Sequence, residues 1–315
     1  MVLVLADVGG TNVRFACVEE GGTAPTNVKR YQNDHYVQFD DAYNAYVTAT
    51  GIERATALSV AVAGPVTGTN ARLTNRDWSL DVEEIAKRHS LSDVFLLNDL
   101  SALGYALDAL DEVGLASISG APDAVHPADQ RLVIGVGTGF NVSPVLKVGP
   151  MTVCLRAEAG LGSLPGRVAR VLERYIGGPA AWVRCAEDAV RGPGLSKLHA
   201  AASGKEPVDA RDIIHAAREG NAQALASVTV YAEMLGELVQ DLRLLYMPQG
   251  GIYLAGSVVR GLLGSPARAK FIETLDAQPS VKSTLAPVPV SLITQDEAAL
   301  LGCLSFARIM GAGAT

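Results

Sequence analysis

The sequence predicts an α/β fold made of two similar domain cores, and three observations support this prediction. A strand, a turn with Gly and Thr, and a returning strand open the chain at Leu3–Val18. The same order returns at Arg131–Lys147. Between these copies, the apolar run Val94–Leu97 leads into polar residues and a helical pattern, as in open α/β sheets that bind ligands at the carboxyl ends of their strands.

The composition is typical of a globular enzyme that acts on a small ligand. The chain has 315 residues, of which 49% are hydrophobic and 19% charged, so it can fill substantial cores. Its net charge is −7 and no Lys/Arg cluster forms a basic stripe, which argues against nucleic acid and membrane surfaces as partners. The four cysteines are scattered without metal-site spacing. No signal-peptide pattern and no apolar run of ~18 residues is present, so we expect a cytoplasmic protein.

The first third of the chain is expected to contain mostly strands, separated by turn-forming residues. Strands are expected at Leu3–Asp7, Val13–Val18, Val28–Gln32, Ala57–Ala63 and Val94–Leu97, with an edge extension at Arg72–Thr74. Helices are expected at Asp40–Thr50, Leu80–His89 and Ser101–Leu110.

A Gly/Pro/Ala-rich connection, Gly114–Asp129, separates this part from the second copy of the pattern. Further strands are expected at Arg131–Val136, Asn141–Lys147, Thr152–Ala157, Ile252–Ala255 and Val288–Thr294. Helices are expected at Arg167–Tyr175, Ala180–Ala189, Arg211–Arg218, Asn221–Tyr246, Arg268–Asp276 and Glu297–Met310. We expect a small domain of residues 1–109 plus 295–315 and a larger one of residues 110–294 with helical insertions.

The opening turn, Val8–Asn12, is either a phosphate cradle or an ordinary hairpin. Its two adjacent glycines let backbone N–H groups converge on an anion, and the Thr and Asn that follow add side-chain donors. Asp7 ends the first strand, where a carboxylate would hold Mg²⁺ against phosphates, directly or through water. The alternative is that the glycines only serve the turn. The second turn, Gly137-Thr138-Gly139, favours the phosphate interpretation, because two such turns could reach one nucleotide.

The pair Asn98-Asp99 is the candidate for catalysis. An Asp at a strand end can accept the proton of a hydroxyl nucleophile, and the neighbouring amide can orient the same substrate. The alternative is structural, because Asn-Asp before a helix is also a typical N-cap.

Further carboxylates and glycines could contribute to a polar site. Glu158 stands in a Gly-spaced loop and Glu187 near the end of a helix. Paired carboxylates suit a polyhydroxylated ligand because each can accept from two adjacent hydroxyls, and a solvated surface charge is the alternative for each. Gly256-Ser257 follows a strand, where Gly permits close approach of a base or ribose. No His belongs to such a pattern, and the Walker A, G-x-S-x-G and protein-kinase motifs are absent.

Taken in order, these motifs resemble those of a known family. They are Asp7-Val-Gly-Gly-Thr-Asn12, Asn98-Asp99, Gly137-Thr138-Gly139, Glu158, Glu187 followed by Gly192-Pro193-Gly194-Leu195, and Ala255-Gly256. Over nearly its full length, the chain resembles the bacterial glucokinases of the hexokinase/actin-like ATPase superfamily. The resemblance implies two ribonuclease-H-like α/β domains around a cleft, with the C-terminal helix packing on the N-terminal domain. It also implies a homodimer that phosphorylates a hexose, in the first place glucose, with ATP and Mg²⁺.

The resemblance further implies a role for each motif. Asp99 would be the general base for the sugar 6-hydroxyl as it attacks the γ-phosphate of ATP. The sugar would be bound by Asn75, Asn98, Asp99, Glu158 and Glu187. The nucleotide would be bound by Ala6, Asp7, Val8, Gly9, Gly10, Thr11, Asn12, Gly137, Thr138, Gly139, Gly256 and Ser257, with Asp7 organising Mg²⁺. Phosphoryl transfer needs positioning, charge neutralisation and exclusion of water, which agrees with these roles.

The main departure from the family concerns the sugar. The family's Glu-Gly-Gly-His run is Glu158-Ala159-Gly160-Leu161 here, and Phe140-Asn141 and Ser257 are smaller departures near the nucleotide motifs. A hydroxyl that faces Leu161 would lose a polar contact, at a cost on the order of 1–3 kcal/mol if it is left unpaired. Three alternatives to a glucokinase therefore stay open: a kinase for another sugar, a non-catalytic sugar- or nucleotide-responsive regulator, and an actin-like ATPase without a sugar acceptor.

Overall fold

The computed structural model describes residues 2–73, 76–120, 129–277 and 288–311 of the chain. The chain divides into two compact units. The first comprises Met1–Gly114, Val148–Cys154 and Gln295–Thr315, and the second comprises Leu115–Lys147 and Leu155–Thr294. Within the described residues, no helix is both long enough and apolar enough to cross a membrane.

The division differs from the expected border between residues 109 and 110. Residues 110–114 and Val148–Cys154 group with the first unit. Val148–Cys154 groups with the first unit because it contacts helix α3 (Asp99–Ala106) and the turn after this helix. The hydroxyl of Thr152 donates to Asp108 at 2.9 Å, and the N–H of Cys154 donates to the hydroxyl of Tyr105 at 3.5 Å.

The first unit contains a five-stranded sheet in the order β3-β2-β1-β4-β8. Its strands are β1 (Val2–Val8), β2 (Asn12–Glu19), β3 (Thr26–Gln32), β4 (Ala57–Val62) and β8 (Asp93–Asn98). β1 is antiparallel to β2 and parallel to β4, which is parallel to β8. Therefore β1, β4 and β8 end at the same edge of the sheet, where Asp7 and Asp99 stand.

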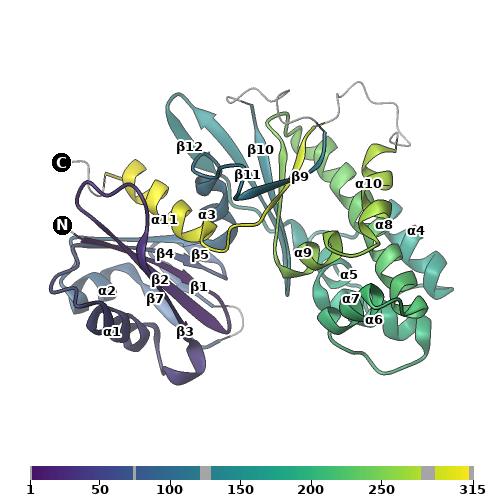
Figure 1. Ribbon diagram of the computed structural model, residues 1–315, viewed down its shortest axis with the longest axis horizontal. Helices are drawn as coiled ribbons and strands as arrows, with labels where there is room; N and C mark the ends of the chain where they lie inside the picture. The colour runs from purple at the N-terminus through teal and green to yellow at the C-terminus, as the bar shows by residue number, and fades with distance from the viewer. Residues whose placement is uncertain (1, 74–75, 121–128, 278–287, 312–315) are drawn as a thin grey trace. The chain divides into compact units, whose positions relative to one another are not determined.

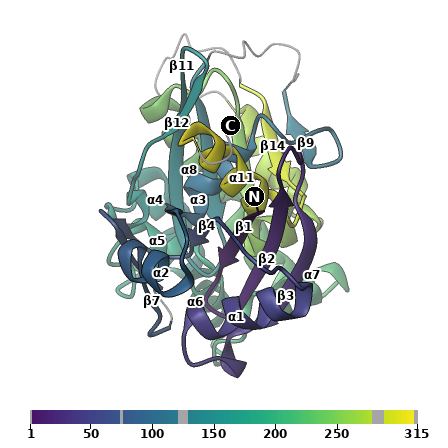
Figure 2. The ribbon, with the colours of Figure 1, turned by 90° about the vertical axis from the view of Figure 1, so that its left-hand side faces the viewer.

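Helices cover both faces of this sheet, as Figures 1 and 2 show. Helices α1 (Phe39–Thr50) and α2 (Val82–His89) lie on one face, and α3 and α11 (Ala298–Ile309) lie on the other. Side chains alternate along a strand, so Asp7 shares the α3/α11 face with the buried Leu3 and Leu5. A separate small sheet contains β5 (Val66–Thr67), β6 (Asn70–Arg72) and β7 (Ser79–Asp81). Of the extension expected at Arg72–Thr74, Arg72 belongs to β6 and Thr74 lies outside the described residues.

Helices α3 and α11 meet at a very close contact. A Cβ atom at Gly302 would lie 1.7 Å from the carbonyl oxygen of Ala102 and 2.5 Å from its carbonyl carbon. Only a residue without a side chain allows this approach. Because α3 begins at Asp99, its packing on α11 helps to fix where that carboxylate stands.

A six-stranded sheet in the order β12-β11-β10-β13-β14-β9 belongs to the second unit, except for β12, which groups with the first. Its strands are β9 (Leu115–Ser119), β10 (Arg131–Val136), β11 (Phe140–Val148), β12 (Met151–Cys154), β13 (Ile252–Ala255) and β14 (Val290–Ile293). As in the first unit, the strand before the glycine turn is antiparallel to the next strand and parallel to a later one. The repeat seen in the sequence therefore corresponds to a repeat of strand topology.

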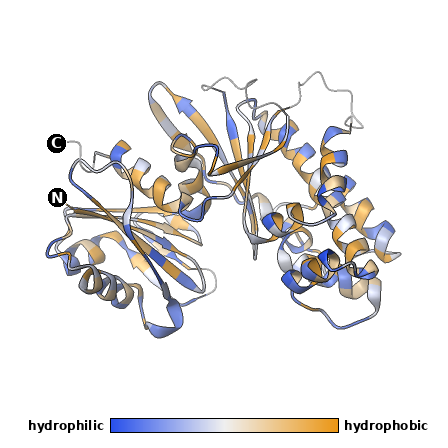
Figure 3. Ribbon diagram, viewed as in Figure 1, coloured by the Kyte–Doolittle hydropathy of each residue, from blue (hydrophilic) through white to orange (hydrophobic). Residues whose placement is uncertain are grey.

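The long helix α8 (Ala222–Tyr246) is the centre of the helical part of this unit. Packed against it are α4 (Gly166–Ile176), α6 (Gly192–Ser203), α7 (Ala210–Arg218) and α10 (Arg268–Asp276). Its apolar side chains at helical spacing, among them Tyr231, Leu235 and Val239, are fully buried in the core. In Figure 3, hydrophobic residues predominate along the strands, while hydrophobic and hydrophilic residues alternate along the helices.

One strand and two α-helices within the described residues of the second unit are not expected from the sequence. Strand β9 lies in the stretch Gly114–Asp129, which is expected to be a connection. Its apolar run is too short to predict a strand, and it forms one by pairing with β14. Helix α9 (Ser257–Leu263) follows Gly256 without a capping side chain, so its start carries no capping signal. Helix α6 begins at Gly192-Pro193-Gly194, which has the composition of a loop.

The helix expected at Ala180–Ala189 is wrong in extent: the helix found there is the short α5 (Ala186–Val190). Asp188 accepts hydrogen bonds from the backbone and the guanidinium of Arg184, which hold the preceding residues in a turn. After α5, Pro193 is tolerated in the first turn of α6 because that turn needs no intrahelical N–H donor. Gly194 is required by packing, since its Cβ would lie 2.4 Å from the carbonyl oxygen of Ala189.

Candidate functional site

The hairpin between β1 and β2 is held from outside by Asn33. The side-chain amide of this buried residue donates to the carbonyl of Gly9 at 2.8 Å, and its backbone N–H donates to the carbonyl of Thr11 at 2.9 Å. Within the turn, the N–H of Gly9 donates to the carbonyl of Asn12. Among the described residues, the N–H groups of Gly10 and Thr11 have no partner. The turn thus presents rigid, unused backbone donors, as an anion site requires.

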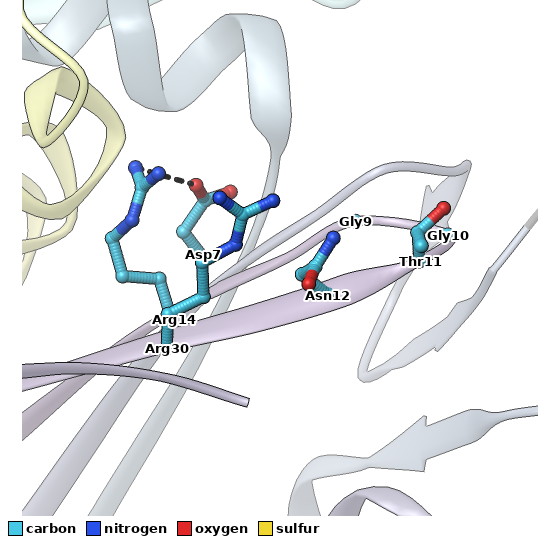
Figure 4. A pocket seen from close by; sticks show the side chains of 7 residues that line it. All are labelled: Asp7, Gly9, Gly10, Thr11, Asn12, Arg14 and Arg30. Carbon is cyan, nitrogen blue, oxygen red and sulfur yellow. Dashed lines mark ion pairs between the residues drawn. The ribbon is translucent and has the colours of Figure 1, made fainter. Parts of the chain in front are cut away.

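The hairpin lines a cavity of about 270 Å³ in the first unit. Its lining residues, drawn in Figure 4, are Asp7, Gly9, Gly10, Thr11, Asn12, Arg14 and Arg30. The turn therefore borders a hollow that combines backbone donors with one carboxylate and two guanidinium groups.

The two arginines and Asp7 form a row across three strands. Arg14 is the direct cross-strand partner of Asp7, and Arg30 is the direct cross-strand partner of Arg14. Nη1 of Arg14 lies 3.8 Å from Oδ2 of Asp7, and the same guanidinium donates to the backbone carbonyl of Asp296. Burial raises the pKa of Asp7, and the positive charge of Arg14 offsets part of this rise.

Asp99 is the first residue of α3, directly after the end of β8. Loss of contact with water raises the pKa of Asp99 to about 6, and the negative charge of Asp7 adds to the rise. One carboxylate oxygen accepts the N–H of Leu100 at 2.9 Å. This hydrogen bond lowers the pKa of Asp99 and so offsets part of the rise. A carboxylate of this kind is ionised at neutral pH and still basic enough to take up a proton.

Asn98 is the N-cap of α3, as the structural interpretation of the pair predicted. Its side-chain oxygen accepts the N–H groups of Leu100 at 3.0 Å and Ser101 at 3.4 Å, and its amide donates to the carbonyl of Gly64 at 3.2 Å. The oxygen is therefore committed to the helix, while the amide also hydrogen-bonds to Asp99 and lowers the pKa of that carboxyl group.

In the second unit, the Gly137-Thr138-Gly139 turn is tight and supported from two sides. The N–H of Gly137 donates to the carbonyl of Gly139 at 2.9 Å, and the carbonyl of Gly137 accepts the N–H of Gly192 at 2.8 Å. Gly256 approaches from β13 with a φ of 109°, and its Cβ would lie 2.4 Å from the carbonyl oxygen of Val136. The close backbone approach requires a glycine at Gly256, whereas a Cβ at Gly137 or Gly192 would make no contact shorter than 3.3 Å.

Glu158 and Glu187 lie close enough to influence each other. Burial raises the pKa of Glu158, and the negative charge of Glu187 adds to the rise. Glu187 accepts the N–H of Phe140 at 3.3 Å and pairs with Arg191 at 3.3 Å. The two carboxylates predicted to bind one polyhydroxylated ligand are therefore neighbours.

The loop that carries Glu158 is held by Asn141, which is not among the expected site residues. The amide of Asn141 donates to Glu158 at 3.1 Å and to the carbonyl of Ala157, while its oxygen accepts the N–H of Ala159. Leu161, at the end of this turn, keeps 67% of its side chain exposed. Phe140 points the other way into the core and is 3% exposed, so it does not narrow the turn beside it.

Some predicted site residues lack a structural test. Asn75 lies outside the described residues. Ala6 and Val8 are fully buried, so any contact with a ligand would be through their backbone. Asn33, Arg14 and Arg30 were missed, although Asp7 and Arg14 stand in register across any hairpin closed at Val8 and Val13.

The comparison with protein families shows to which family the chain belongs. The family model described as Glucokinase matches residues 4–310. The chain belongs to the glucokinase family.

Relatives within the glucokinase family are similar over more than nine-tenths of their length. The chain is 28% identical to a glucokinase of Caulobacter vibrioides over 312 residues, covering 95% of this chain and 93% of the relative. It is 30% identical to a glucokinase of Agrobacterium fabrum over 323 residues, covering 97% and 92%. The family resemblance inferred from the short motifs is therefore confirmed.

Solved structures of glucokinases share the fold. A glucokinase from an Antarctic psychrotroph matches with a TM-score of 0.81 at 24% identity, covering 98% of this chain and 99% of that one. A ROK family glucokinase from Streptomyces griseus, solved in complex with glucose and AMPPNP, matches with a TM-score of 0.64 at 22% identity, covering 98% and 100%. The expected actin-like ATPase fold of this family is confirmed.

Proposed function

We propose that this glucokinase-family protein transfers the γ-phosphoryl group of ATP to the 6-hydroxyl of glucose. The observation that carries the proposal is Asp99, a carboxylate with a pKa of about 6 at the edge of the sheet that also carries Asp7 and the phosphate-binding turn. A protein that only bound sugar would have no use for such a base. Membership of the family and the glucokinase relatives support the same reaction.

Asp99 acts as the general base in this proposal. It accepts the proton of the 6-hydroxyl while the oxygen of that hydroxyl attacks the γ-phosphorus of ATP and the bond to the leaving ADP breaks. Above about pH 6 it is ionised and ready to do so. The side-chain amide of Asn98 and the carboxylates of Glu158 and Glu187 bind sugar hydroxyls, and we assign Asn75 to the sugar as well.

The two glycine turns serve the nucleotide. The free N–H groups of Gly10 and Thr11 donate to phosphate oxygens, and the N–H groups of Thr138 and Gly139 supply a second set of backbone donors. Gly256 and Ser257 bind the adenosine part.

Asp7 is the residue that we assign to Mg²⁺. Its carboxylate lines the cavity, and its charge raises the pKa of Asp99, a repulsion that a divalent cation would relieve. No group of three or more His, Cys, Asp or Glu side chains among the described residues could hold a metal by itself. This fits Mg²⁺, which in kinases is held by one or two carboxylates together with water and the substrate phosphates. When bound, the ion would neutralise charge on the phosphates.

A second candidate is a kinase for another sugar, and one observation favours it. Leu161 stands where the family has a histidine on the sugar, and its exposed side chain can make no hydrogen bond. A sugar with an apolar or missing group at this position would fit such a site better than glucose does. We further propose that the protein works in the cytoplasm, as a homodimer, at the entry of hexoses into glycolysis.

The direct test is release of ADP from MgATP in the presence of a panel of hexoses. Glucose should give the highest kcat/KM, and Asp99→Asn should lower kcat by about 10²–10⁴-fold while glucose still binds. A preference for another hexose would support the second candidate. Folded protein that binds glucose but turns over no sugar would contradict both, and hydrolysis of ATP without any hexose would point to an ATPase.

A further inference from the structure

Arg30 is an unpaired cation beside the phosphate-binding turn. It lies on β3, directly opposite Arg14 on β2, and both guanidinium groups line the same cavity (Figure 4). Arg14 is compensated by Asp7 and by the carbonyl of Asp296. Among the described residues, Arg30 has no hydrogen-bond or ion-pair partner.

This arrangement is unfavourable in the absence of a ligand. Like charges directly opposite each other on neighbouring strands destabilise a sheet, and Arg14 cannot move away because it is held on two sides. The cavity contains one negative side chain, Asp7, against two positive ones. An anion in the cavity would remove the imbalance, and the free N–H groups of the turn would bind the same anion.

We propose that Arg30 is a binding residue for the phosphate chain of the nucleotide that donates the phosphoryl group. This rests on the proposed function for the identity of the donor, ATP. Arg14 keeps Asp7 oriented, and Arg30 supplies the uncompensated charge that the polyphosphate recruits. The planar guanidinium suits phosphate oxygens because it donates two parallel hydrogen bonds in a fixed geometry.

Lys29 provides a matched control on the same strand. It is exposed, like Arg30, and it stands opposite Phe15, whose side chain lies in the core on the α1/α2 side of the sheet. Lys29→Gln therefore removes the same charge from the same strand on the opposite face. Arg30→Lys keeps the charge and loses the paired donors.

The experiment measures ATP binding by calorimetry without sugar and steady-state kinetics with it, for the parent, Arg30→Gln, Arg30→Lys and Lys29→Gln. Arg30→Gln should weaken ATP binding and raise the KM for ATP about tenfold, with kcat and the KM for sugar unchanged. The KM for ATP of Arg30→Lys should fall between those of the parent and Arg30→Gln. The KM for ATP of Lys29→Gln should stay within about twofold of the parent value. The effect should shrink as salt is raised, because Arg30 is exposed.

Thermal unfolding without ligand separates binding from a structural role. Arg30→Gln should keep or raise the melting temperature, because it removes a like-charge pair. Equal ATP affinity in Arg30→Gln and the parent would overturn the proposal, as would an equal loss in Lys29→Gln, which would reflect net charge alone. If the parent binds ATP but phosphorylates no sugar, the proposed function fails, and the binding data still decide the role of Arg30.

Discussion

Replacing Gly302 with Ala tests whether the packing of α11 on α3 positions Asp99, the carboxylate that we propose as the base. The added methyl group would lie 1.7 Å from the carbonyl oxygen of Ala102, far inside the contact distance of real side chains. The two helices would have to part by more than about 1 Å, because both atoms of the carbonyl are backbone and cannot rotate away. Asp99 begins α3 and would move with it.

The expected loss of stability is the difference between two effects. Overpacking a core typically costs 1–3 kcal/mol, and this overlap is severe enough for the upper end or beyond. Alanine in a helix recovers about 1 kcal/mol relative to glycine. The net loss is about 2 kcal/mol, which lowers the melting temperature by about 4–8 °C for a unit of this size.

Calorimetric unfolding and steady-state kinetics should be measured together, with Gly166→Ala as the control. Gly166 is also helical, and its Cβ would meet only the end of the flexible Arg170 side chain at 3.6 Å, an ordinary contact. Gly302→Ala should lose both stability and kcat, and Gly166→Ala neither. A Gly302→Ala variant with the melting temperature and kcat of the parent would refute the argument that this contact fixes α3.

Two further predictions concern the base and the turn. The value of kcat/KM for glucose should fall about tenfold per pH unit below about pH 6, because Asp99 with its raised pKa becomes protonated there; a profile flat to pH 5 would exclude it as the base. Asn33→Ala removes the amide that holds the carbonyl of Gly9, so the KM for ATP should rise several-fold while the KM for sugar stays constant. Asn70→Ala, which loses only an exposed contact with Thr69, should change neither, and an equal effect of both variants would argue against the role of Asn33.

Local patterns explain what the sequence could predict. The glycine turns and the strands beside them were found because a hairpin is specified by neighbouring residues. The duplicated strand topology followed from these turns. In contrast, β9 becomes a strand only through β14, which lies far away in the chain, and no local signal distinguishes it from a connection.

The residues of the candidate site also divide into those that local patterns predict and those that only the tertiary structure reveals. Asp7, Asp99 and Glu187 were selected because their residue types and neighbours suggest chemistry. Arg30 could not be placed opposite Arg14, because the pairing of β2 with β3 shifts register between Phe15 and Cys17. Gly302 and Gly194 looked like ordinary glycines, since only the tertiary structure shows which backbone approaches them.

Asp99 links stability to function with opposite signs. Its pKa is raised from 3.8 to about 6, so the folded protein binds this proton more tightly than the unfolded chain does. The stabilising effect of the proton is complete below about pH 4 and is lost as the pH rises through 6. Above that pH, the ionised carboxylate that the reaction needs makes the folded state less stable than a neutral side chain would.

Asp99→Asn should therefore raise the melting temperature at pH 8 but not at pH 4, while it lowers kcat by about 10²–10⁴-fold. The amide oxygen can still accept the N–H of Leu100, so the start of α3 is kept. Asp81→Asn, at the N-cap of α2 in the same unit, is the control and should give no gain at pH 8. Calorimetry of the ligand-free variants at both pH values decides the matter. If Asp99→Asn lost stability equally at pH 4 and pH 8, Asp99 would be a structural cap. This result would argue against Asp99 as the general base.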